Sequence, residues 1–94
     1  MIKRNVLGKT NIKVSAIGFG GAPIGDLFDK LDEQVCYDTL KVSHNSDINF
    51  FDTSPFYGHG LSEHRIGNYL KSINHNDFVL CTKVGRYLIP DKPE

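Results

Sequence analysis

Apolar positions along this chain follow two periods, which alternate from one segment to the next. Three short segments are mostly apolar, which is typical of buried β-strands. These predicted strands are the first half of Ala16–Pro23, Ile48–Asp52 and Phe78–Thr82. The two segments between them carry apolar residues at helical spacing, and each begins at a common helix-capping residue, Asp32 or Ser62. The pattern therefore predicts the order strand, helix, strand, helix, strand.

The helical spacing also predicts which side of each helix is buried. The first helix, expected to stop at 44–47, groups on one face Val35, Cys36, Thr39, Leu40 and Ser43. The second groups Ile66, Tyr69, Leu70 and Ile73. Gly67 inside the second helix costs about 1 kcal/mol of helix propensity. We therefore expect close packing of that helix at Gly67, on a sheet.

An N-terminal hairpin over Val6–Val14 precedes these elements, because a Gly-, Thr- and Asn-rich turn separates two short apolar stretches. Strands that alternate with helices predict an α/β fold with parallel pairing. Strands that are apolar on both faces need cover on both sides. Two arrangements fit, the start of a barrel or the start of an open doubly wound sheet. A complete (β/α)8 TIM barrel takes roughly 250 residues, so this chain would hold its first three strands and two helices.

The composition narrows the class of protein. Apolar residues make up 39% of the chain, and its 11 Lys and Arg balance its 11 Asp and Glu. This balance favours neither a nucleic-acid nor a membrane partner. The first residues lack the apolar core of a secretion signal, and no apolar run approaches the roughly 20 residues of a membrane span. We expect a cytoplasmic protein with reduced thiols at Cys36 and Cys81.

Three polar residues fall in corresponding places. Asp52 ends the second predicted strand, Tyr57 lies in the loop after it, and Lys83 follows the third strand. Ligands of α/β proteins gather at such strand ends. A buried lysine beside a phenol favours the phenolate, and a carboxylate keeps that lysine charged and oriented. The three residues would thus move a proton during carbonyl reduction or alcohol oxidation, with hydride exchanged by a nicotinamide cofactor.

Each of the three residues also has an ordinary structural reading. An aspartate at a strand end is often a turn residue, a loop tyrosine a surface anchor, and a lysine after a strand a solvated charge. Spacing alone leaves these readings open.

His59 and His64 lie five apart across a loop and a helix start. That is poor metal geometry without a further ligand, so we expect no metal site.

Three segments decide between these readings by resemblance: Leu7–Gly25, Phe51–Leu70 and Asp77–Arg86. Their sequences, LGKTNIKVSAIGFGGAPIG, FDTSPFYGHGLSEHRIGNYL and DFVLCTKVGR, resemble the N-terminal part of the aldo/keto reductase family. They are most similar to its aldose 1-dehydrogenase and pyridoxal dehydrogenase branch. The resemblance implies that residues 1–94 are the N-terminal part of one barrel domain. It also implies NAD or NADP as cofactor and a small sugar, hemiacetal or carbonyl compound as substrate.

The resemblance also implies roles for single residues. The catalytic residues would be Asp52, Tyr57 and Lys83, and the cofactor-binding residues would be Gly20, Gly21, Asp52 and Thr53. Asp47 stands where the family usually has glycine, at a position that we expect to need a left-handed backbone, which Asp tolerates.

The family's catalytic histidine would follow one βα unit after Lys83, and its sites for the cofactor's phosphates and adenine would follow later still. We therefore expect the 94-residue chain to be inactive alone and to associate with itself through open sheet edges. Two alternatives stay open. One is a noncatalytic regulatory or partner subunit on the same fold, and the other is a truncated product without function.

Overall fold

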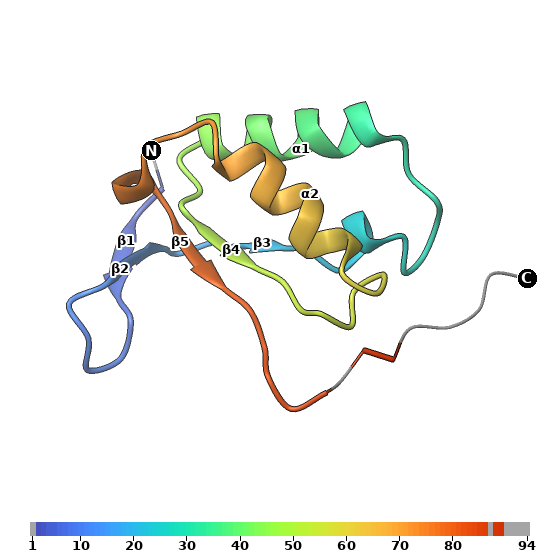
Figure 1. Cartoon of the computed structure of the whole chain (residues 1–94). Helices are drawn as coiled ribbons and strands as arrows, with labels where there is room; N and C mark the ends of the chain where they lie inside the picture. The colour runs from blue at the N-terminus through green and yellow to red at the C-terminus, as the bar shows by residue number, and fades with distance from the viewer. Residues whose placement is uncertain (1, 87, 90–94) are drawn as a thin grey trace, which may run out of the picture.

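The computed structural model describes residues 2–86 and 88–89. A two-stranded antiparallel hairpin, β1 and β2, precedes a three-stranded parallel sheet of order β3-β4-β5, with α1 and α2 in the two crossovers (Figure 1). The elements are β1 Arg4–Val6, β2 Lys13–Ser15, β3 Phe19–Gly20, η1 Pro23–Gly25, α1 Glu33–Asn45, β4 Phe50–Asp52, α2 Leu61–Leu70, η2 His75–Asp77 and β5 Val79–Cys81. The predicted order of hairpin, strands and helices is confirmed.

Both helices lie on one side of the sheet (Figure 1). β4 is the central strand, and its Phe51 is aligned with Phe19 of β3 and Leu80 of β5. Phe51 is fully buried beneath the helices. The core that forms there consists of Ile24, Cys36, Leu40, Phe51, Ile66, Tyr69 and Leu70. One helical layer on a twisted parallel sheet is therefore the framework of the chain.

The first helix begins as predicted, but its buried face differs. The carboxylate of Asp32 accepts a hydrogen bond from the backbone N–H of Gln34 at 2.8 Å, which confirms this cap. Cys36 and Leu40 are buried, whereas Val35 and Thr39 are exposed. The buried stripe turns toward α2, because the Tyr37 ring packs edge-on against Tyr69 with ring centres 5.3 Å apart. The predicted face was therefore wrong at two positions.

The predictions for the second helix were partly wrong. Its stripe of Ile66, Tyr69 and Leu70 is buried as expected. However, the N-cap is Gly60, with φ of 94°, and Ser62 lies inside the first turn. Gly67 is exposed, and among the described residues no tertiary neighbour lies within 4 Å of where its Cβ would be. The expected close packing at this glycine is thus wrong, because it faces away from the sheet.

The strands are shorter than predicted. The first half of Ala16–Pro23 is not a buried strand, since residues 16–18 are exposed and β3 spans only Phe19–Gly20. Leu80 in β5 is 47% exposed. These side chains are exposed because β3 and β5 lie at the edges of the described sheet, where no further element covers them on both faces. Even in the central strand β4 only Phe51 is buried, and Phe50 and Asp52 are half-buried.

Polar side chains join the hairpin to the rest of the fold. The buried Asn49, just before β4, accepts the N–H of Ser15 at 2.6 Å and donates to the carbonyl of Lys13 at 3.0 Å. Asp47 adopts φ of 75°, which confirms the expected left-handed backbone. Its carboxylate accepts from Arg4 at 3.0 Å, and this bond lowers the pKa of Asp47. The hairpin is thus fixed to the end of α1 and the start of β4.

Two further expectations concern the cysteines and the membrane. Both thiols are free, and burial raises the pKa of the Cys36 thiol. Among the described residues, neither helix has the length and apolar character required to cross a bilayer.

Candidate active site

The carboxyl ends of the three parallel strands meet at one edge of the sheet. The Gly21 N–H donates to the Asp52 carbonyl, and the Thr53 N–H donates to the Cys81 carbonyl, both at 2.8 Å. These bonds continue the sheet one residue beyond its strands. They bring the segments that carry Gly20, Asp52 and Lys83 side by side, as the sequence predicted.

The central contact of this edge is an ion pair. The Lys83 ammonium donates to both carboxylate oxygens of Asp52, at 3.0 and 2.9 Å, and to the Thr53 carbonyl at 3.0 Å. The hydrogen bond to Asp52 raises the pKa of Lys83, against the lowering effect of desolvation. The Lys83 side chain is 45% exposed and that of Asp52 is 38% exposed. The expectation of a buried lysine was therefore wrong, and the pair is accessible to a ligand.

Tyr57 completes the predicted group of three. The Lys83 nitrogen lies 5.1 Å from the centre of the Tyr57 ring, within the range of a cation–π contact. The loop that carries Tyr57 crosses the backbone of η1 closely. A Cβ on Gly58, which has φ of 72°, would lie 2.1 Å from the carbonyl oxygen of Gly25. Glycine is thus required at Gly58 by both its conformation and this crossing.

A cleft of roughly 270 Å³ opens beside Tyr57 and Lys83. It is lined by Ser54, Pro55, Phe56, Tyr57, Lys83, Val84 and Arg86. The guanidinium of Arg86 lies over the Phe56 ring, 4.4 Å from its centre. The cleft combines an apolar wall with the phenol of Tyr57 and the ammonium of Lys83, which is typical of a small-molecule site.

The residues expected to contact the cofactor differ in their surroundings. A Cβ on Gly20 would meet no tertiary neighbour within 4 Å in the described structure, so this backbone can be approached from outside. Gly21 is buried, and a Cβ there would lie 2.6 Å from the Ser62 hydroxyl oxygen. Thr53 is 2% exposed, and its hydroxyl bonds to Ser62 at 2.7 Å. Only Gly20 therefore presents open backbone, while Gly21 and Thr53 pack inward.

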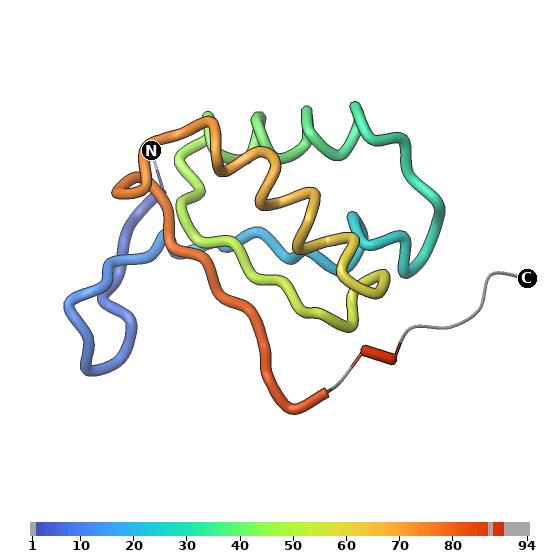
Figure 2. The backbone as a smooth tube through the Cα atoms, viewed as in Figure 1, coloured from blue at the N-terminus to red at the C-terminus, as the bar shows by residue number. Residues whose placement is uncertain are grey.

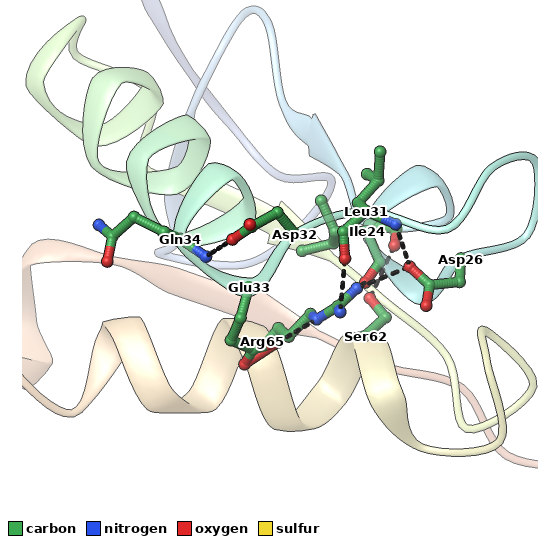
Figure 3. Close-up of polar contacts among 9 residues, drawn as sticks. Ile24, Asp26, Leu31, Asp32, Glu33, Gln34, Ser62 and Arg65 are labelled. Atoms are coloured by element: carbon green, nitrogen blue, oxygen red, sulfur yellow. Dashed lines mark hydrogen bonds and ion pairs between the residues drawn. The ribbon is translucent and has the colours of Figure 1, made fainter.

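A buried arginine that the sequence interpretation missed lies between the helices and η1. Arg65 of α2 donates to Glu33 at 2.5 Å, to Asp26 at 2.9 Å, and to the carbonyls of Ile24 and Leu31 at 2.8 and 3.2 Å (Figure 3). The bond from Arg65 lowers the pKa of the Asp26 carboxyl. Helical spacing could have revealed this buried arginine in the sequence. Arg65 lies four residues before Tyr69, which places both side chains on the buried face of α2.

Within residues 2–86 and 88–89, no three or more His, Cys, Asp or Glu side chains lie together as metal ligands would.

Residues 16–94 match the model of the Aldo/keto reductase family. The chain belongs to the aldo/keto reductase family. Its members are oxidoreductases, and the segment described here corresponds to the N-terminal part of their barrel. The predicted family and fold class are thus confirmed.

Relatives and solved structures give the extent of the match. L-galactose dehydrogenase from Arabidopsis thaliana is 43% identical over 88 residues, which are 92% of this chain and 28% of that protein. D-threo-aldose 1-dehydrogenase from a Pseudomonas species is 38% identical over 80 residues, 85% of this chain and 24% of that protein. The holo form of an aldo-keto reductase from Bacillus halodurans superposes with a TM-score of 0.79 at 32% identity, covering 90% of this chain and 26% of that one. This aldo/keto reductase chain therefore spans about a quarter of the length of the proteins it matches.

Proposed function

We propose that this chain carries the proton-transfer residues of an NAD(P)-dependent oxidoreductase. The substrate class is a small sugar, a cyclic hemiacetal or a related carbonyl compound. One observation supports this most directly: the Lys83 ammonium bridges the Asp52 carboxylate and the ring of Tyr57 at the wall of a cleft. The names of two relatives, an L-galactose dehydrogenase and a D-threo-aldose 1-dehydrogenase, support the sugar substrate.

Each of the three residues has a distinct role in this proposal. The Tyr57 phenol gives a proton to the substrate oxygen in reduction and takes it back in oxidation. The Lys83 ammonium stabilises the negative charge that develops on the phenol when its proton leaves. Asp52 holds the ammonium through two hydrogen bonds and keeps it charged.

The cofactor is NAD or NADP, which when bound exchanges hydride with the substrate carbon. The open backbone at Gly20 fits the approach of a flat ring toward the strand ends. Asp52 lies at the same edge and would contact the ribose of a bound cofactor. For the 94-residue chain by itself we propose no turnover, because Asp52 and Lys83 are both more than a third exposed. Water around the pair weakens the electrostatic stabilisation of the transition state.

A chimera tests the catalytic role. Residues 1–94 of this chain replace the matching segment of the Arabidopsis thaliana L-galactose dehydrogenase, to which the chain is 43% identical. In an active chimera, Tyr57→Phe is expected to lower kcat at least ~100-fold, the scale for losing a general acid or base. The KM for the cofactor should change little, because the phenol acts on the substrate oxygen. Steady-state kinetics with sugar substrates measures both.

Tyr37→Phe is the matched control, because it removes a phenol hydroxyl from α1, away from the strand ends. This variant should retain kcat within about twofold. If Tyr57→Phe also retained activity within a few-fold, Tyr57 would have no part in proton transfer. The alternative of a noncatalytic partner subunit would then be favoured.

A further inference from the structure

A buried hydroxyl connects two of the strand ends that carry the candidate site. Ser62, in the first turn of α2, is fully buried. Its Oγ donates to the carbonyl of Gly21 at 2.7 Å and is bonded to the Thr53 hydroxyl at 2.7 Å. Gly21 follows β3 and Thr53 follows β4. One side chain of a helix therefore holds the ends of two neighbouring strands.

The direction of these bonds follows from counting protons. A carbonyl oxygen only accepts, so the single hydroxyl proton of Ser62 goes to Gly21. The Thr53 hydroxyl must then donate its own proton to the Ser62 oxygen. No hydroxyl proton of Thr53 remains for a ligand, and its side chain is 2% exposed. Thr53 thus takes part in an internal network.

The same turn of α2 reaches the third strand end and the charged pair. The carboxylate of Glu63 accepts from the hydroxyl of Thr82, just before Lys83, at 2.7 Å. The carbonyl of Thr53 accepts from the Lys83 ammonium at 3.0 Å. Movement of the Thr53 segment would therefore move an acceptor of Lys83 directly.

We infer that Ser62 is a positioning residue, which acts through Gly21 and Thr53 to set the spacing of the β3 and β4 ends and so the geometry of Asp52 and Lys83. Thr53 is its partner in this network and does not donate to the cofactor. This inference rests on the proposed function, because it concerns the same candidate site. Its test uses the 94-residue chain and needs no activity, so the two can fail separately.

Amide hydrogen exchange followed by NMR tests this positioning. The Gly21 and Thr53 N–H groups donate across the carboxyl edge of the sheet, to Asp52 and Cys81. The Val79 N–H donates to the Asn49 carbonyl at 2.7 Å, at the other end of the same strands, and serves as the internal reference. In Ser62→Ala, the Gly21 and Thr53 amides should exchange at least ~10-fold faster relative to Val79, the effect of one lost buried hydrogen bond on local opening.

Two further variants keep the test decisive if Ser62→Ala does not fold. Thr53→Val keeps the shape and removes the hydroxyl, so the Thr53-position amide should accelerate while Gly21, still bonded to Ser62, should not. Thr53→Ser keeps the hydroxyl and should restore exchange to within about threefold of the original chain. Ser72→Ala is the matched control, because it removes a hydroxyl bond to the Tyr69 carbonyl at the far end of α2. It should leave the ratios unchanged.

Equal acceleration of all three amides in both Ser62→Ala and Thr53→Val would overturn the inference. The hydroxyls would then contribute only to global stability. Unchanged exchange in both variants would overturn it equally, because the strand ends would keep their spacing without the network.

Discussion

Lys83 is bound at both oxygens of Asp52 and is still 45% exposed on its side chain. This combination defines the site at the scale of single residues. The raised pKa of Lys83 means that the folded chain holds this proton more tightly than the unfolded chain does. The pair therefore stabilises the fold below the ordinary pKa of lysine wherever the Asp52 carboxylate is ionised. Its contribution is lost as the pH rises through the raised value.

Asp52→Asn is expected to lower the pKa of Lys83 toward its ordinary value, because the amide cannot supply the anionic acceptor. The difference in stability between the two chains should also disappear at high pH. A ¹³C or ¹⁵N NMR titration of the Lys83 side chain measures the first effect, and urea unfolding at several pH values measures the second. Asp38→Asn, on the exposed side of α1, is the control and should leave the Lys83 titration unchanged. An unaltered Lys83 pKa in Asp52→Asn would contradict the observed pairing.

At the scale of elements, α2 organises the chain. Its inward face packs on Phe51, its first turn holds the strand ends through Ser62, and its Arg65 bonds to η1, to the segment after it and to the start of α1 (Figure 3). Its outward face is much less constrained, as the exposed Gly67 shows. Substitutions of glycine on the outward face of α2 and beside its inward face should thus change the free energy of unfolding in opposite directions.

Gly67→Ala should stabilise the chain by about 0.5–1 kcal/mol, because alanine restricts the unfolded backbone and favours the helix. Among the described residues, nothing within 4 Å obstructs the new methyl group. Gly21→Ala should destabilise it by about 2 kcal/mol or more, since its Cβ would lie 2.6 Å from the Ser62 oxygen and 2.8 Å from the Asp52 carbonyl. Urea unfolding followed by circular dichroism gives both values. A destabilised Gly67→Ala would mean that this helix face is covered in solution.

Arg65→Ala should cost about 3 kcal/mol, because it removes a buried charge that satisfies two carboxylates and two carbonyls. Arg65→Lys should give an intermediate loss, since one ammonium cannot reproduce the planar fork of the guanidinium. The control is Arg4→Ala, which breaks the exposed pair with Asp47 and should cost less than about 1 kcal/mol. The same denaturation measurement compares the three variants. If Arg65→Ala and Arg4→Ala lost the same free energy of unfolding, the burial of Arg65 would add nothing to its stabilising effect.

At the scale of the whole molecule, the helices cover one side of the described sheet only (Figures 1 and 2). β3 and β5 are edge strands in the described sheet. Leu80 on β5 is 47% exposed, and Ile17 beside β3 is exposed as well. Exposed edges with apolar side chains offer a template for pairing with another chain.

We therefore expect the purified 94-residue chain to associate as its concentration rises. Leu80→Lys should weaken this association, because a charge on an edge strand opposes strand pairing. Val42→Lys adds the same charge on the exposed side of α1 and should have little effect. Sedimentation velocity over a range of concentrations measures the association. A chain that stays monomeric at every concentration, or a greater effect of Val42→Lys, would argue against pairing at the sheet edge.

The sequence by itself determined the order of elements, the cap at Asp32 and the meeting of Asp52, Tyr57 and Lys83. These features follow from local spacing together with one topological rule. Parallel strands joined by helices end at the same edge of a sheet, so residues just after them must come together. No knowledge of side-chain packing is needed for that conclusion.

Only the tertiary structure decided what the remaining residues contact. Ser62 reads as a helix cap from its neighbours, but its hydroxyl bonds to segments 41 and 9 residues away in the chain. Arg65 likewise finds its partners between 32 and 41 residues away, and the exposure of Lys83 depends on what covers the strand ends. Such contacts are set by the relative placement of whole helices and strands, which the sequence near each residue does not encode.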